Sequence, residues 1–271
     1  MTHPQIAAFA RLAKENTPPT RVLQGQKTLI SRTMHGFGYD EIHDEIVVTS
    51  PLAQAILIFR GGANGEEPPA RYIQGPRTQI LGGPTGSLDR VTVDPVNNEI
   101  LLASAPDGVL VFDRTASGDV QPKRVLRGPD TQIRGRPAVV IDPVHNLLIA
   151  NSGGAMLIFD RTASGNTRPK AVIRGPKSGV TSIDSFQVYP QKGWIIGGCA
   201  GGSVCAWSVN DNGDVPPRWK IPVEQLTGYV ASGIALDPVH QEIMLSAAAQ
   251  RVRPANGIAN AVITFSWPEI F

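Results

Sequence analysis

The chain has 271 residues, and 25 Lys and Arg against 23 Asp and Glu leave a net charge of only +2. So small a charge provides no strong field toward nucleic acid or an anionic membrane, so neither is expected as a partner. The 28 Gly, 23 Pro and 41 % apolar residues predict many turns, few long helices and a packed core.

No apolar run approaches the roughly 18 residues of a membrane helix. Residues 1–16 also lack the basic start and apolar block of a signal peptide. The compartment stays open, since the sequence carries no positive targeting signal.

An aromatic side chain recurs along the chain with a period near 50 residues. The intervals are 50, 53, 47, 48 and 58 residues between Phe9, Phe59, Phe112, Phe159, Trp207 and Phe265. An acidic turn keeps the same register at Asp40, Asp94, Asp142, Tyr189 and Asp237. Periods of this length are typical of propeller blades, solenoids or helical arrays.

Each repeat is expected to form four short β-strands. Strands near 89–94, 99–103, 109–112 and 124–127 represent one unit. Consecutive apolar positions in these strands indicate sheets buried on both faces, while β-branched residues, Gly and Pro disfavour helix. Five first strands, near 35–40, 89–94, 137–142, 184–189 and 232–237, predict an all-β fold: a five-bladed β-propeller of four-stranded antiparallel blades.

The N-terminal segment precedes the first complete unit. We expect the outer strand that starts at Arg21 to be lent to the last blade, where it would close the ring and remove a free edge. Residues 1–17 then form an extension, and residues 18–271 form a single propeller domain. Residues 5–10 fit either a surplus third strand or a short helix with Ile6, Phe9, Ala10 and Ala13 on one face. We favour the helix.

The turn Asp-Pro-Val-His at 142–145 has a structural explanation. Its Pro presets φ, and its Asp side chain can accept backbone N–H groups. His43, His145 and His240 accompany this turn in different blades, so we do not expect them to meet at one metal ion. Cys199 and Cys205 flank a hairpin and could form a disulfide, but Cys205 aligns with core leucines, which favours a small buried hydrophobe.

The repeated phrase Ile-x-Val-Asp-Pro…Glu-Ile-Leu-x-Ala…Leu-Ile-Phe-Asp-Arg resembles the NHL-repeat class of β-propellers over about residues 20–267. The resemblance implies a ring with a narrow central channel. It is specific for fold and weak for function, because this broad class includes scaffolds, ligand-binding domains and metal-dependent lyases and hydrolases.

Polarity varies most at the starts of the inner strands, which should surround one mouth of the channel. These positions are His35, Asp89, Pro137, Asp184 and Ser232, with Arg136 beside them. His35, Asp89 and Asp184 could bind a divalent cation or act as acid and base. Alternatively, each of these residues caps its own strand.

Other residues are expected near the same mouth. The ends of second strands, among them Ser104 and Asn151, would extend the pocket wall or serve as ordinary hairpin residues. The insertion at 250–260, with Arg251 and Arg253, would form a lid or an exposed loop tip.

The leading hypothesis is a non-catalytic propeller that binds a small ligand, an ion or a protein partner at this mouth. The alternatives are a metal-dependent lyase or hydrolase that uses the same residues, and a purely structural scaffold. Arginines that recur on outer strands should form a solvated rim, and no aromatic platform accompanies them to bind nucleic acid: Arg21, Arg71, Arg124, Arg127, Arg174 and Arg218. Catalytic residues, cofactor and oligomeric state stay open.

Overall fold

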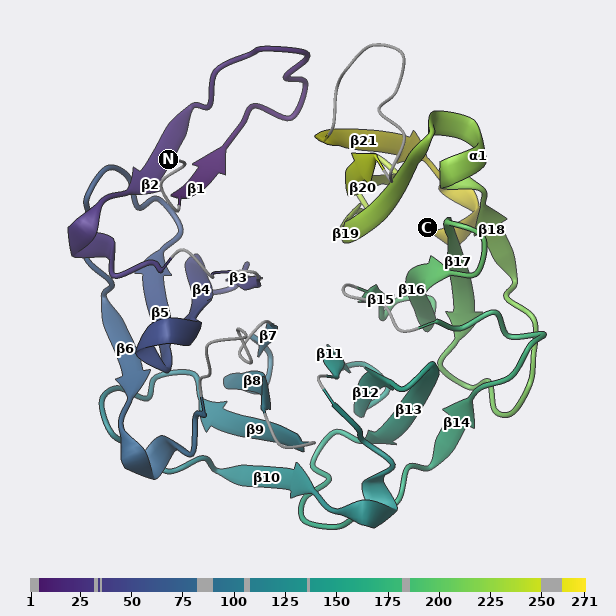
Figure 1. Cartoon of the computed structure of the whole chain (residues 1–271), viewed down its shortest axis with the longest axis horizontal. Coiled ribbons are helices and arrows are strands. Elements are labelled where there is room, and N and C mark those ends of the chain that lie inside the picture. The colour runs from purple at the N-terminus through teal and green to yellow at the C-terminus, as the bar shows by residue number, and fades with distance from the viewer. Residues whose placement is uncertain are drawn as a thin grey trace. The chain divides into compact units, whose positions relative to one another are not determined.

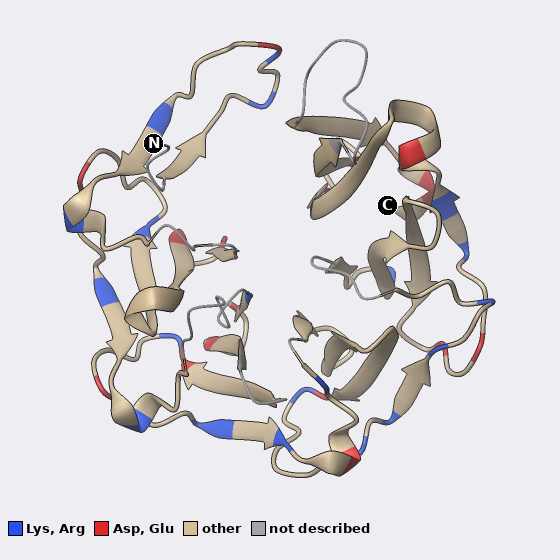
Figure 2. Ribbon diagram, in the orientation of Figure 1, with Lys and Arg blue, Asp and Glu red and all other residues tan. Residues whose placement is uncertain are grey.

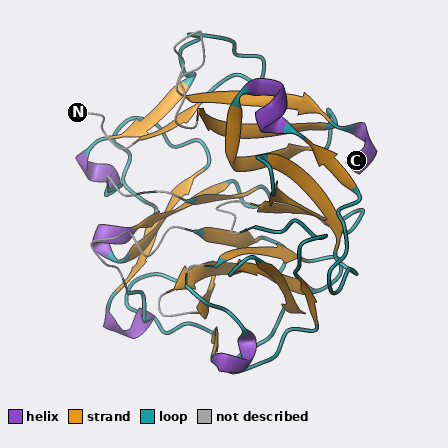
Figure 3. Ribbon diagram, turned by 45° about the vertical axis from the view of Figure 1, so that its right-hand side comes forward, coloured by secondary structure: helices purple, strands orange, loops and turns teal. Residues whose placement is uncertain are grey.

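The computed structural model describes residues 5–31, 34, 36–81, 90–104, 108–135, 137–181, 186–249 and 260–271 (Figure 1). Almost all regular structure in this part is β-strand, accompanied by short helical turns (Figure 3). Its α-helix, α1 (Val223–Thr227), has five residues, and no helix here is long and apolar enough to cross a membrane. The chain divides into two compact units, residues 1–125 and 126–271.

The first unit contains a two-stranded sheet and two four-stranded antiparallel blades. The two-stranded sheet pairs β1 (Gln5–Ala8) with β2 (Arg21–Gln24). The next blade contains β3 (Phe37–Asp40), β4 (Glu45–Ser50), β5 (Ala55–Arg60) and β6 (Arg71–Gln74). The second blade contains β7 (Val91–Asp94), β8 (Glu99–Ser104), β9 (Gly108–Asp113) and β10 (Arg124–Arg127), whose last two residues belong to the second unit.

The second unit contains three further antiparallel sheets. One blade contains β11 (Ala138–Asp142), β12 (Leu147–Ser152), β13 (Ala155–Asp160) and β14 (Ala171–Ile173). The next contains β15 (Phe186–Tyr189), β16 (Trp194–Cys199), β17 (Ser203–Ser208) and β18 (Trp219–Ile221). The last sheet contains β19 (Tyr229–Asp237), β20 (Glu242–Ala249) and β21 (Asn260–Ser266).

These sheets confirm, at the level of the blades, the predicted class of all-β, five-bladed propeller. Within each unit the first strands of successive blades lie side by side, β3 with β7 and β11 with β15. Apolar residues from neighbouring blades belong to one core cluster, as Ile58 and Phe112 do. The periodic aromatics Phe59, Phe112, Phe159 and Trp207 are fully buried. Burial on both sheet faces explains the unbroken apolar runs.

The N-terminus differs from the expectation in its first element. Residues Gln5–Ala8 form a strand, so the helix that we favoured is wrong and the surplus-strand alternative holds. β2 pairs with this strand, with Ile6 opposite Leu23, and the sheet β19–β21 has three strands among the described residues. That β2 is lent to this last sheet stays a prediction. Residues 9–20 connect β1 and β2, and so short a connection costs little loop-closure entropy.

The repeated acidic turn has the predicted chemistry. Asp142 Oδ1 accepts hydrogen bonds from the backbone N–H groups of Val144 (3.0 Å) and His145 (2.9 Å). Its other oxygen lies 2.8 Å from His145 Nδ1, so the histidine is held by its own turn. The turn therefore needs no ligand to explain its composition.

Two other expectations are corrected. Cys199 and Cys205 form a disulfide between β16 and β17, and are not the free buried thiols that we favoured. Arg71 and Arg124 do not belong to a solvated rim, because they pair with Glu45 and Glu99.

Candidate functional site

Most of the predicted mouth residues cannot be placed. His35, Asp89, Arg136 and Asp184 lie outside the described residues, as does most of the 250–260 insertion, so their convergence and the cation site stay predictions. The described residues contain no group of three or more His, Cys, Asp or Glu that could hold a metal ion.

Two of the predicted mouth residues, Asn151 and Ser232, lie in the described part of the chain and form hydrogen bonds with nearby protein groups. Asn151 is 2 % exposed, and its Nδ2 donates to Thr181 O at 3.1 Å. Ser232 is exposed; its hydroxyl lies 3.3 Å from Ser246 O and 3.2 Å from Ser246 Oγ, beside a β-bulge. Ser104 ends β8, but its side chain is outside the described part. Asn151 and Ser232 thus have protein partners, and their role at the channel mouth stays a prediction.

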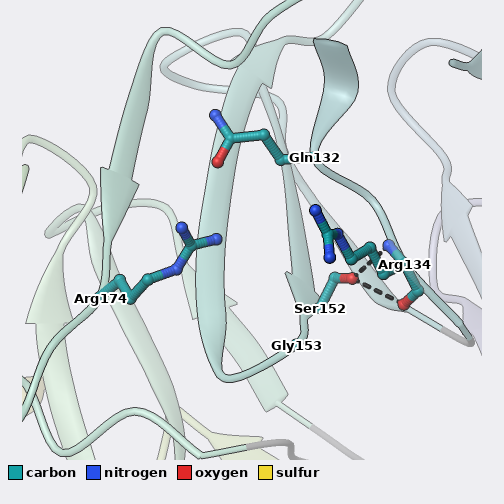
Figure 4. A pocket seen from close by; sticks show the side chains of 5 residues that line it. All are labelled: Gln132, Arg134, Ser152, Gly153 and Arg174. Carbon is teal, nitrogen blue, oxygen red and sulfur yellow. Dashed lines mark hydrogen bonds between the residues drawn. The ribbon is translucent and has the colours of Figure 1, made fainter. Parts of the chain in front are cut away.

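A pocket of about 250 Å³ lies within the second unit, at one end of blade β11–β14 (Figure 4). Three segments contribute to it: the β10–β11 connection, the β12–β13 turn and the residue after β14. They supply Gln132, Arg134, Ser152, Gly153 and Arg174. These are fourth-to-first and second-to-third connections, the kind expected on the functional face, although the residues differ from the predicted set.

A tight turn presents Gln132 and Arg134. In the 3₁₀ turn Pro129–Thr131, Thr131 Oγ1 donates to Gly128 O at 2.7 Å, and Asp130 N–H donates to Asn166 Oδ1 at 2.7 Å. Gln132 then takes a left-handed conformation with φ of 59°. The next residue, Ile133, is buried, so the two polar residues flank an anchored apolar side chain.

Ser152 fixes the backbone of Arg134. Its hydroxyl donates to Arg134 O at 2.8 Å and accepts the Arg134 N–H at 2.7 Å. Ser152 is 3 % exposed, and these two bonds use its proton and one lone pair. It therefore acts as a positioning residue for the arginine and is poorly placed to be a nucleophile.

The neighbouring blade positions Arg174. Its backbone N–H donates to Gly213 O at 3.2 Å, while Ile173 before it is fully buried. The Arg174 side chain is exposed and points toward the same space as the side chains of Gln132 and Arg134 (Figure 4). Two guanidinium groups and one carboxamide thus approach one volume from two segments.

The sequence segment that contains the pocket residues has a positive net charge, while Asp214 of the neighbouring blade lies beside Gly175 and accepts the Ser178 N–H at 2.9 Å. Residues 126–181 contain eight Lys and Arg and three Asp, a net charge of +5, whereas the whole chain carries +2 (Figure 2). The three carboxylates lie near other bases: Asp130 near Arg168 (3.7 Å), Asp142 near His145 (2.8 Å) and Asp160 near Lys170 (2.8 Å). Within the described residues, neither Arg134 nor Arg174 has an acidic partner, and no carboxylate lines the pocket.

Internal repetition provides a comparison for these arginines. Blade β3–β6 reproduces part of the scaffold: Thr28 Oγ1 donates to Gly25 O at 2.6 Å, as Thr131 does to Gly128 O, but Ser50 Oγ donates to Leu29 O at 3.2 Å, at the position of Gln132 and not of Arg134. The strand registers place Leu29, Ser31 and Gln74 where blade β11–β14 has Gln132, Arg134 and Arg174. The corresponding residues of blade β15–β18 are Gly179, Thr181 and Pro222. In blade β7–β10 the corresponding residues are Gln79, Leu81 and Arg127, so Arg174 has a basic counterpart in the repeat, whereas Arg134 does not.

Sequence reasoning missed this pair because it aligned the units on the acidic turn. The motif Gly-Pro-x-Thr/Ser at 75–78, 128–131 and 175–178 provides a second register. In that register Arg134 is the basic residue among neutral equivalents. The strand pairing also shows that Ser152, and not Asn151, corresponds to Ser50 at the end of its second strand.

No protein-family model matches the chain, and no curated protein matches it in sequence. The NHL-like assignment therefore rests on the repeat pattern, while the structure supports the broader assignment of propeller blades.

Proposed function

We propose that this chain is a binding β-propeller that holds the anionic group of a small ligand in the pocket of blade β11–β14. One observation carries the proposal: Arg134 and Arg174 converge on a single pocket without an acidic partner among the described residues. Guanidinium forks match carboxylate and phosphate oxygens, and such charge-assisted bonds are about twice as strong as neutral ones.

The composition of the pocket supports binding over catalysis there. Its lining offers Arg, Gln, Ser and Gly, and the hydroxyl of Ser152 already bonds to the backbone. A hydrolase or lyase needs a general base or a bound metal ion, and none of these lining side chains is a His, Asp, Glu or Cys. The mouth around His35, Asp89 and Asp184 stays a separate prediction.

Two substitutions test the proposal with little risk to the fold. Arg174→Gln introduces the residue that blade β3–β6 has as Gln74, and Arg134→Ser introduces the equivalent of Ser31. Arg168→Gln is the control, because this side chain is 80 % exposed and does not line the pocket.

Isothermal titration calorimetry with phosphate, sulfate and acetate at low ionic strength provides the readout. We expect the parent and Arg168→Gln proteins to bind at least one of these anions. Each pocket substitution should weaken that binding by about tenfold or more, as loss of a charge-assisted hydrogen bond requires. Absence of binding by any anion, or binding unchanged in both pocket variants, would overturn the proposal.

A further inference from the structure

We infer that the pocket of blade β11–β14 selects a doubly charged tetrahedral oxyanion, of the phosphate-monoester class, over singly charged anions. The inference rests on the proposed function and specifies its ligand. Its first support is charge balance. Arg134 and Arg174 bring two positive charges, and among the described residues neither has an acidic partner and no carboxylate lines the pocket; Asp214, which lies beside Gly175, bonds to the Ser178 N–H. A dianion neutralises both charges, whereas a monoanion leaves one of them uncompensated.

The second support is the number of donors that the three side chains offer. Each guanidinium presents N–H groups in a planar fork, and the amide of Gln132 adds two more N–H donors. Figure 4 shows these three groups directed into one volume from different sides. One fork suffices for the two oxygens of a carboxylate, whereas two forks and an amide match the three terminal oxygens of a phosphate monoester.

The third support is size. At about 250 Å³ the pocket is smaller than the roughly 300–1,000 Å³ typical of sites that enclose a whole small molecule. It can hold a phosphoryl head group and leave the rest of the ligand in solvent. Both arginines are exposed, so they can reach such a head group without being buried first.

Binding should then depend on pH through the ligand alone. The second pKa of a phosphate monoester is about 6, so the dianion dominates at about pH 7.5 and falls to about a tenth at pH 5. The described residues that line the pocket are Arg, Gln, Ser and Gly, none of which titrates in that interval. Sulfate stays doubly charged across the interval and serves as the control ligand.

The experiment compares methyl phosphate, dimethyl phosphate, acetate and sulfate by calorimetry at about pH 7.5 and pH 5. We expect methyl phosphate to bind at least tenfold more tightly than dimethyl phosphate or acetate at the higher pH. At the lower pH its affinity should fall about tenfold while that of sulfate is unchanged. Arg174→Lys, which keeps the charge but loses the fork, should weaken methyl phosphate binding yet retain the preference for dianions.

The outcomes separate this inference from the proposed function. If acetate and dimethyl phosphate bind as tightly as methyl phosphate, and Arg174→Gln weakens all three, selection of a dianion is overturned while the anion pocket stands. If methyl phosphate and sulfate lose affinity equally at pH 5, a titrating protein group is responsible and the inference is also overturned. If no anion binds, both proposals fail.

Discussion

Arg124 donates two parallel hydrogen bonds to Glu99, with Nη1–Oε1 at 2.6 Å and Nη2–Oε2 at 2.7 Å. Glu99 begins β8 and is only 3 % exposed, and Lys123 Nζ lies 3.1 Å from the same carboxylate. In blade β11–β14 the equivalent positions hold the apolar pair Leu147 and Ala171. In blade β15–β18 they hold Trp194 and Trp219, edge to face with ring centroids 4.7 Å apart. The starts of the second and fourth strands of a blade are therefore occupied by an ion pair, by two apolar residues or by two tryptophans, depending on the blade.

This matching predicts a strong coupling between Arg124 and Glu99. Arg124→Ala should lower the free energy of unfolding by about 3 kcal/mol, because it leaves a buried carboxylate with Lys123 alone. The double variant Glu99→Leu/Arg124→Ala copies the apolar pair and should recover most of this loss. Urea unfolding of both single variants and the double variant measures the coupling. Additive losses would contradict the prediction.

The paired carboxylates of Glu99 and Glu45 should make the free energy of unfolding depend on pH in the acid range. Burial raises the pKa of Glu99, but the hydrogen bonds and charges of Arg124 and Lys123 outweigh it and hold this pKa below its usual value. Burial likewise raises the pKa of Glu45. The hydrogen bonds and charges of Arg71 and Arg114 outweigh this effect, so the pKa of Glu45 lies below its usual value. A carboxylate whose pKa is lower in the folded state contributes stability above its unfolded pKa.

We therefore expect the free energy of unfolding to decline as the pH falls below about 4.5, through the folded pKa values of these groups. Glu99→Leu/Arg124→Ala lacks one of the two groups, so its decline should be shallower. Urea titrations between pH 7 and pH 3 test this. An equal slope for the parent and the double variant would count against the role of Glu99.

The disulfide between β16 and β17 should stabilise the second unit. Cys199 and Cys205 are buried, with Cα atoms 5.9 Å apart. Replacing both by Ala should cost about 2 kcal/mol, since the bond closes only a short loop. A reductant should lower the melting temperature of the parent but not that of the double variant. Alkylation of either cysteine in denatured, unreduced protein would show that the bond is absent.

The C-terminal residues should act as an anchor for the last sheet. Trp267 and Ile270 are buried in the cluster shared by blade β15–β18 and β19–β21, and the Phe271 ring meets Tyr189 edge to face at 5.1 Å. Trp267→Ala should cost about 3 kcal/mol and Phe271→Ala about 1 kcal/mol. The exposed Glu269→Ala should change stability by less than about 0.5 kcal/mol and is the matched control. Chemical unfolding compares the three, and an unaffected Trp267→Ala protein would refute the anchor.

The blades could be predicted from the pattern of residues along the chain. The aromatic period and the unbroken apolar runs report burial, and burial on both faces is what a propeller sheet imposes on residues such as Phe112 and Phe159. Even the turn at Asp142 was readable, because its hydrogen bonds join residues two and three positions apart.

The pairing of polar groups could be seen only in the folded chain. Arg124 has the pattern of an exposed strand residue, but its partner Glu99 lies 25 residues earlier, on another strand. Arg134 and Arg174 are 40 residues apart and meet because a turn and the end of a strand reach the same side of one blade. The apolar pattern of a sequence indicates which residues are buried. The role of a polar group depends instead on which groups lie next to it in space. Only the folded blade supplies that second fact.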